Sequence, residues 1–167
     1  AASSLQSVVE ATLRSAEQLP EEGWVVELPS PSYRLCADKD WRDELTALQS
    51  ARWVTAVVSA DRRCGVEQFA PARLADPGVA EVASRVSVVE CPELPAGGAR
   101  VRVGTQVVNE VLAAPGSPER PVERDDIEFK LVTAAGARRA REILAAVSTD
   151  GDALRMSVRG QPSAAKN

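Results

Sequence analysis

Few of the side chains in this sequence are able to do chemistry. The chain has no histidine, one tyrosine and three cysteines among its 167 residues. Without histidine, Ser-His-Asp and Cys-His catalysis, imidazole acid–base chemistry and histidine metal ligation are all excluded. Any reaction would therefore use Asp, Glu, Lys, Tyr, Cys or Arg, or groups that another chain supplies.

The cysteines do not form a recognisable site. Cys36, Cys64 and Cys91 lie far apart, no pair has CxxC spacing, and their number is odd. This pattern predicts free thiols and no metal site, with a cysteine nucleophile as the less supported alternative. No GxGxxG or GxxxxGK[ST] loop is present, and PAGGAR at 95–100 is a glycine turn with no helix after it. We therefore expect no cofactor.

One charged stretch, ADKDWRDE at residues 37–44, surrounds Trp41. A solvated loop is the favoured interpretation of this stretch. The alternative is an anion pocket in which Arg34, Lys39 and Arg42 hold a carboxylate.

Lys130 lies in the stretch PGSPERPVERDDIEFKLVTAAG, residues 115–136. The two acids before it, Asp125 and Asp126, favour a helix start, where negative charge complements the helix dipole. Lys130 is then either a working residue or a surface charge that pairs with nearby acids and covers the sheet edge with its stem.

The composition is that of a soluble globular protein, with 44% hydrophobic and 26% charged residues. The net charge of −4 gives no basic face for nucleic acid. No apolar run is long enough for a membrane helix, and the start lacks the features of a signal peptide. We expect a cytoplasmic protein with no nucleic-acid or membrane partner, and the abundance of Arg, Ala and Val suggests a bacterial source.

Local patterns in the first half of the chain predict the elements that would position these residues. Ser3 or Ser4 is expected to cap a helix that ends at Pro20 and Gly23. Next we expect a strand over 24–28, then a turn-prone stretch over 29–40 and a helix within 45–60. The first part of that helix could equally be a strand.

The second half begins with a turn at Gly65 into a short extended piece, followed by a helix capped by Asp76 with Pro77 in its first position. Alternating Val86, Val88 and Cys91 predict a strand. A hairpin is predicted around Gly104, with one face wetted by Arg100 and Arg102, and then two helices broken at Gly136.

This order of elements predicts an α+β fold with a small mixed or antiparallel sheet packed with helices. No repeat or linker divides the chain. We expect one domain over residues 1–157 and a disordered tail over 158–167.

Several segments together resemble the MmgE/PrpD family. They are PGSPERPVERDDIEFK, CGVEQFAPARLADPGVAEVASRVSVVE and ELTALQSARWVTAVVSA, and their order and spacing agree from about Leu5 to about Leu154. The family includes 2-methylcitrate dehydratase, cis-aconitate decarboxylase and iminodisuccinate epimerase. The resemblance covers only the C-terminal lid domain of that family.

The resemblance implies an α+β lid that closes over small di- or tricarboxylates and works without a metal or organic cofactor. In the family, a large helical domain supplies most catalytic residues. The family's lysine- and histidine-bearing segment would lie before residue 1.

One motif departs from the family pattern. The family has Ser-(Leu or Ile)-Pro-Tyr where this chain has Ser50, Ala51, Arg52 and Trp53. Tryptophan cannot donate a proton as tyrosine does, and Arg52 adds a charge at the mouth of the site. Ser50 and Lys130 are retained. The family's dehydratase or decarboxylase chemistry therefore does not transfer to this chain acting alone.

Three functions follow as hypotheses, of which the first is favoured and the other two are alternatives. The first is a repurposed, cofactor-free isomerase, lyase or cyclase that acts on a small carboxylated or natural-product substrate in a biosynthetic pathway. The second is the lid subunit of a split enzyme with a helical partner, and the third is a non-catalytic binding module. A homodimer stays open in each case. For the first hypothesis, the catalytic candidates are Arg52 and Tyr33, and the substrate-binding candidates are Arg34, Ser50, Trp53 and Lys130.

Overall fold

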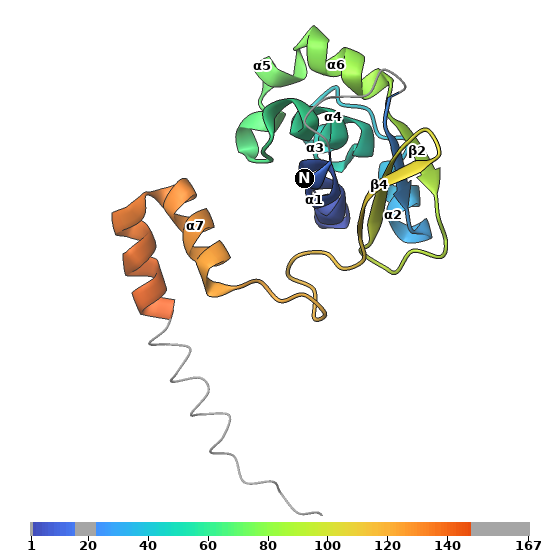
Figure 1. Cartoon of the computed structure of the whole chain (residues 1–167). Coiled ribbons are helices and arrows are strands. Elements are labelled where there is room, and N and C mark those ends of the chain that lie inside the picture. Colours follow the sequence, from blue (N-terminus) through green and yellow to red (C-terminus); the bar gives the residue numbers. More distant parts are fainter. Residues whose placement is uncertain (1, 16–22, 148–167) are drawn as a thin grey trace, which may run out of the picture. The chain divides into compact units, whose positions relative to one another are not determined.

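The computed structural model describes residues 2–15 and 23–147, and these fall into two compact units that divide between Pro121 and Val122 (Figure 1). Each unit is described by itself. The predicted domain limit at 157 and the predicted tail over 158–167 lie outside the described residues, as do residues 16–22. The first helix, expected to end at Pro20, ends already at Arg14, because Ser15 has an extended backbone.

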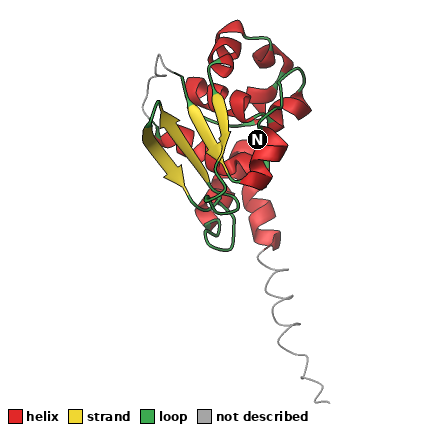
Figure 2. Ribbon diagram, turned by 90° about the vertical axis from the view of Figure 1, so that its right-hand side faces the viewer, coloured by secondary structure: helices red, strands yellow, loops and turns green. Residues whose placement is uncertain are grey.

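The first unit contains a four-stranded mixed sheet with strand order β2-β1-β3-β4. Strands β1 and β2 are parallel, whereas β1 and β3, and β3 and β4, are antiparallel. Figure 2 shows the strands as one layer beside the helices. This confirms the predicted α+β class with a small mixed sheet. The strands are β1 (Val25–Leu28), β2 (Ser87–Glu90), β3 (Ala99–Val103) and β4 (Gln106–Val111).

The two faces of the sheet differ in chemistry because side chains alternate along each strand. Val26, Leu28 and Val101 are fully buried and belong to the hydrophobic core. On the other face Arg100 forms ion pairs with Glu27 at 2.8 Å and with Glu110 at 2.6 Å. These hydrogen bonds, first to Glu110 and then to Glu27, raise the pKa of Arg100. The predicted hydrophilic face of the hairpin is therefore confirmed, as an ion-paired surface.

Helices α1 and α4 provide most of the core that covers the inner face. Helix α4 contacts α1 and α6, and α1 contacts β3 and β4. Seven residues of α4 are buried: Ala51 and the six consecutive residues from Trp53 to Val58. Arg52, between them, is exposed. The helices of this unit are η1 (Ser3–Leu5), α1 (Gln6–Arg14), α2 (Ser30–Cys36), α3 (Glu44–Gln49), α4 (Ala51–Asp61), η2 (Val66–Phe69), α5 (Pro71–Leu74) and α6 (Pro77–Ser84).

Three expectations about local structure were wrong. The turn-prone stretch contains helix α2, because Pro31 lies in the first helical turn, where proline is tolerated, and Pro29 precedes the helix as its N-cap. The piece after Gly65 is a 3-10 helix rather than extended, since the Gln68 side chain accepts a hydrogen bond from the Gly65 N–H at 2.8 Å. The first helix begins without a serine side-chain cap, because the Ser4 hydroxyl lies 3.3 Å from the sulfur of Cys36.

Several other local predictions are confirmed. The hairpin between β3 and β4 turns at Gly104, whose φ of 55° lies in the left-handed region. The helix predicted within 45–60 is present as two helices, α3 and α4, which are separated at Ser50 by an extended backbone. Asp76 caps α6 by accepting hydrogen bonds from the N–H groups of Gly78 and Val79 at 2.9 and 3.2 Å.

The second unit is helical where the structure describes it. Helix α7 (Arg124–Ala135) begins one residue before the predicted Asp125. It ends at Gly136, whose φ of 78° is unfavourable for residues with a side chain, and residues 137–147 form another helix. The predicted break at Gly136 is therefore confirmed. In the described part of the chain, no helix is both long and apolar enough to cross a membrane.

The cap at Asp76 gives a testable pH dependence. Hydrogen bonds from Val79 and Gly78 hold the pKa of Asp76 below its usual value of 3.8. A carboxylate with a lowered folded-state pKa stabilises the fold above its unfolded pKa, and this stabilisation is lost as the pH falls through the folded value. We expect Asp76→Ala to lower the Tm at neutral pH, and the difference from the wild type to shrink below about pH 4.

The matched control is Glu81→Ala, because Glu81 is exposed on the same helix. This variant should unfold at nearly the wild-type temperature. A loss of Tm in Asp76→Ala that stays constant down to about pH 3 would show that the ionised carboxylate is not the cause.

Candidate functional site

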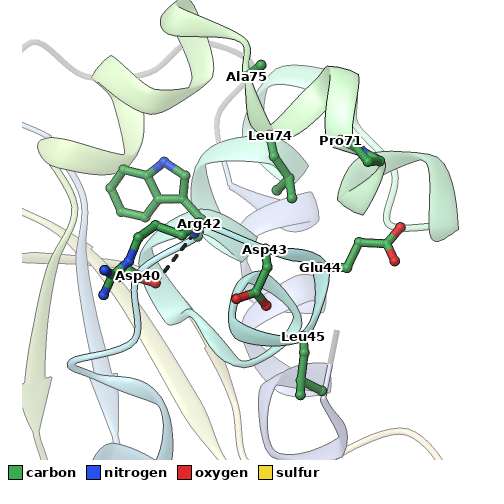
Figure 3. A pocket seen from close by; sticks show the side chains of 9 residues that line it. Asp40, Arg42, Asp43, Glu44, Leu45, Pro71, Leu74 and Ala75 are labelled. Atoms are coloured by element: carbon green, nitrogen blue, oxygen red, sulfur yellow. Dashed lines mark hydrogen bonds and ion pairs between the residues drawn. The ribbon is translucent and has the colours of Figure 1, made fainter.

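A pocket of about 900 Å³ lies between α3 and α5 on the first unit. Figure 3 shows Asp43, Glu44 and Leu45 on one side of it and Pro71, Leu74 and Ala75 on the other. Most of its surface is apolar, and the polar groups lie on the loop before α3 and at the first residue of that helix, Glu44. The pocket is lined by Asp40, Trp41, Arg42, Asp43, Glu44, Leu45, Pro71, Leu74 and Ala75.

The wall formed by α3 is fixed by a capping box. The Asp43 side chain accepts a hydrogen bond from the Thr46 N–H at 2.9 Å, and the Thr46 hydroxyl lies 3.3 Å from the Asp43 nitrogen. These bonds, led by the backbone bond from Thr46, hold the pKa of Asp43 below its usual value. The loop that carries the polar residues therefore enters α3 at a defined angle, with Asp43 ionised at neutral pH.

The pocket is more acidic than the sequence suggested. Arg42 pairs with Asp40, drawn as a dashed line in Figure 3, so its charge is already balanced. Arg34 donates from Nε to the carbonyl of Ser30 at 3.3 Å, and Lys39 is exposed. Of the three cations proposed for an anion pocket, only Arg42 lines this hollow. The carboxylates of Asp43 and Glu44 leave the rim negative.

Trp41 connects the pocket wall to the hydrophobic core. Its ring stacks on that of Trp53, with centroids 5.9 Å apart and an interplanar angle of 26°. Trp53 is fully buried, and its indole N–H donates to the carbonyl of Gln68 at 3.1 Å. The position of Trp41 therefore depends on a tryptophan that is itself held by the core.

A second hollow, of about 350 Å³, lies beside the first. Glu44 lines both hollows, so they adjoin at the start of α3. Burial raises the pKa of the Cys64 thiol, which keeps this cysteine uncharged at neutral pH. The second hollow is lined by Glu44, Leu48, Cys64, Gly65, Val66 and Phe69.

A partly buried polar network, in which Gln68 is the buried member, holds the segment between α4 and α6. The Gln68 amide donates to Asp61 at 2.8 Å, and Arg73 forms ion pairs with both Asp61 and Asp76. Asp61 ends α4, Gln68 lies in η2 and Arg73 lies in α5. The network therefore fixes the elements that form the far walls of both hollows.

The six residues selected from the sequence occupy several different places, and none of them lines either hollow. Ser50 and Trp53 are fully buried. The Ser50 hydroxyl donates to the carbonyl of Lys39 at 2.7 Å and accepts from the Trp53 N–H at 3.3 Å. Both residues therefore have clear structural roles, and a substrate would reach neither without rearrangement of the chain around them.

The other four candidates are accessible. Arg52 is exposed in the first turn of α4, Tyr33 is half-buried on α2, and Arg34 is exposed one residue further along. Lys130 is exposed on α7, in the second unit. The catalytic and binding roles of these residues stay predictions.

Sequence reasoning missed the residues that form the hollows. The loop around Trp41 was noted, but as a solvated stretch or an anion pocket. Glu44, Leu45 and Leu74 carried no signal of their own, because leucines at helical spacing normally indicate core. They line a common hollow only because α3 and α5 pack side by side.

The fold belongs to the α+β class, with a mixed four-stranded sheet that packs against the buried helix α4. Residues 1–150 match the family model of the MmgE/PrpD C-terminal domain. The chain therefore belongs to the MmgE/PrpD C-terminal domain family, which confirms the resemblance to the lid domain. Comparison with curated proteins gave no match.

The Trp53 hydrogen bond can be tested by substitution. Trp53→Phe would leave the buried carbonyl of Gln68 without its donor and remove part of the ring that supports Trp41. We expect the free energy of unfolding in urea to fall by about 1–3 kcal/mol from the unsatisfied carbonyl, with a further loss from the cavity. Trp41→Phe is the matched control, because Trp41 is only half-buried. Equal, small effects of the two substitutions would contradict the structural role of Trp53.

Proposed function

We propose that this chain acts as a substrate-enclosing lid in a cofactor-free reaction on a small carboxylated substrate. A helical partner domain or subunit would supply the acid–base groups. The observation that carries this proposal is the family match over residues 1–150, taken with a sequence that contains no histidine. The resemblance to the family implies that most catalytic residues lie in the helical domain.

The altered Ser-Ala-Arg-Trp stretch supports a contribution from Arg52. Ser50 and Trp53 are anchored in the core, which fixes the first turn of α4. Arg52 lies between these anchors and is exposed. A guanidinium on a rigid helical turn is well suited to hold a carboxylate of the substrate, because two of its N–H groups can bind both oxygens. Closing the lid would then add this charge to a site built mainly by the partner.

A second candidate function is a self-sufficient isomerase, lyase or cyclase. The pocket between α3 and α5 favours it, because a volume of about 900 Å³ falls within the range of about 300–1,000 Å³ typical of ligand sites. The negative rim of that pocket suits a largely apolar substrate better than a carboxylated one. The third hypothesis, a non-catalytic binding module, needs no reacting group at all.

Turnover separates these functions. The purified chain should be inert on 2-methylcitrate and cis-aconitate, and should support turnover only with the purified helical domain of an MmgE/PrpD protein from the same cells. Turnover by the chain alone would overturn the lid proposal in favour of the self-sufficient enzyme. No turnover with either preparation, together with no complex in size-exclusion chromatography with light scattering, would favour a binding module.

Arg52→Ala tests the role of the exposed guanidinium. We expect kcat/KM of the reconstituted pair to fall by about tenfold or more, because one charge-assisted contact to the substrate is lost. Stability should change by no more than about 0.5 kcal/mol, since the side chain is exposed. Arg63→Ala, an exposed arginine beyond the end of α4, is the matched control and should keep full activity. An unchanged kcat/KM in Arg52→Ala would remove this residue from the site.

A further inference from the structure

Two of the most exposed large hydrophobic side chains of the first unit lie at the adjoining hollows. Val66 is 84% exposed and lines the smaller hollow, whereas Leu45 is 67% exposed and lines the larger one. Together the two hollows form one continuous surface, which we call the α3 groove. Its apolar lining consists of Trp41, Leu45, Leu48, Val66, Phe69, Pro71 and Leu74.

The exposure of Leu45 and Val66 argues for a macromolecule rather than a small ligand. A small molecule in a pocket is normally enclosed over most of its surface by inward-facing side chains. Here two apolar side chains stand on the rim, where a compact ligand in either hollow would leave much of them in contact with water. A helix laid along the groove would cover both.

The charges on the rim select the chemistry of that helix. Asp43 is ionised because its pKa is lowered by the bonds from Thr46, and the charge of Asp40 is balanced by Arg42. Glu44 lies where the two hollows meet. The groove thus combines an apolar floor with unbalanced negative charge, which complements lysine or arginine on the partner.

The groove is built on fixed elements. The capping box holds the start of α3, and the pairing of Arg73 with Asp61 and Asp76 holds α5 against its neighbours. A surface that is already ordered loses little conformational entropy when a partner binds.

We propose that the α3 groove docks one amphipathic, basic helix of a partner protein. Its apolar side chains fill the two hollows, and its lysine or arginine side chains pair with Asp43 and Glu44. The assignment of this helix to the helical partner rests on the proposed function, whereas the binding chemistry of the groove does not.

The probe is a synthetic helix of about 18 residues, long enough to be stable, with leucines at positions i, i+3, i+4 and i+7 and lysines beside them. Titration into the chain is followed by tryptophan fluorescence and by calorimetry. We expect saturable binding of one peptide per chain. The same peptide with glutamate in place of each lysine should bind about tenfold more weakly or worse, because it repels the rim.

Variants of the chain localise the binding. Leu45→Lys and Glu44→Lys should each weaken binding of the lysine peptide by about tenfold or more. Leu35→Lys and Glu81→Lys are the matched controls, since Leu35 is 61% exposed on α2 and Glu81 is exposed on α6, away from the groove. They should bind as the wild type does, and the Tm should show that all four variants are folded.

Four outcomes would overturn the proposal, and the first three concern peptide binding. These are no binding of the lysine peptide, equal binding of both peptides, and equal binding by the groove and control variants. A dimer in sedimentation experiments that is lost in Leu45→Lys would also overturn it, because the groove would then be occupied by a second copy. If the peptide fails but the helical domain still restores turnover, the docking site is wrong and the lid function stands. If the peptide binds but no helical domain restores turnover, the docking site stands and the lid function is wrong.

Discussion

The hydrogen bond from the Trp53 indole to the carbonyl of Gln68 is the interaction on which this domain depends. It links the most buried helix to the 3-10 turn that follows it. The side chain of Gln68 then extends the link to Asp61, and Arg73 carries it on to Asp76 at the start of α6. At its buried end, Trp53 and Gln68 favour one arrangement of the packed elements, because an unsatisfied polar group there would be costly. Both hollows lie against this arrangement.

Ser50 adds a second constraint. Its extended backbone separates α3 from α4, and its hydroxyl binds the carbonyl of Lys39 while accepting the Trp53 N–H. One small side chain therefore caps a helix, orients the preceding helix and anchors the loop that leads to Trp41. Ser50 is thus shared with the family motif, but in this chain its hydrogen bonds hold the backbone in place.

Features that depend on neighbouring residues could be predicted from the sequence. The Asp76-Pro77 helix start, the hairpin at Gly104 and the break at Gly136 each follow from the conformational limits of one or two residues. The α3 groove could not be predicted, because it exists only where α3, η2 and α5 meet. The same holds for Trp53 and Ser50, whose types suggested a substrate site but whose burial is decided by tertiary packing.

The outer strand β4 affects whether copies of this protein can join edge to edge at high concentration. Strand β4 ends the described sheet, and its pairing with β3 shifts register between Val101 and Arg102. An irregular edge that also carries Gln106 and Glu110 is a poor template for another strand. Growth of the sheet by addition of another strand at β4 is thereby disfavoured.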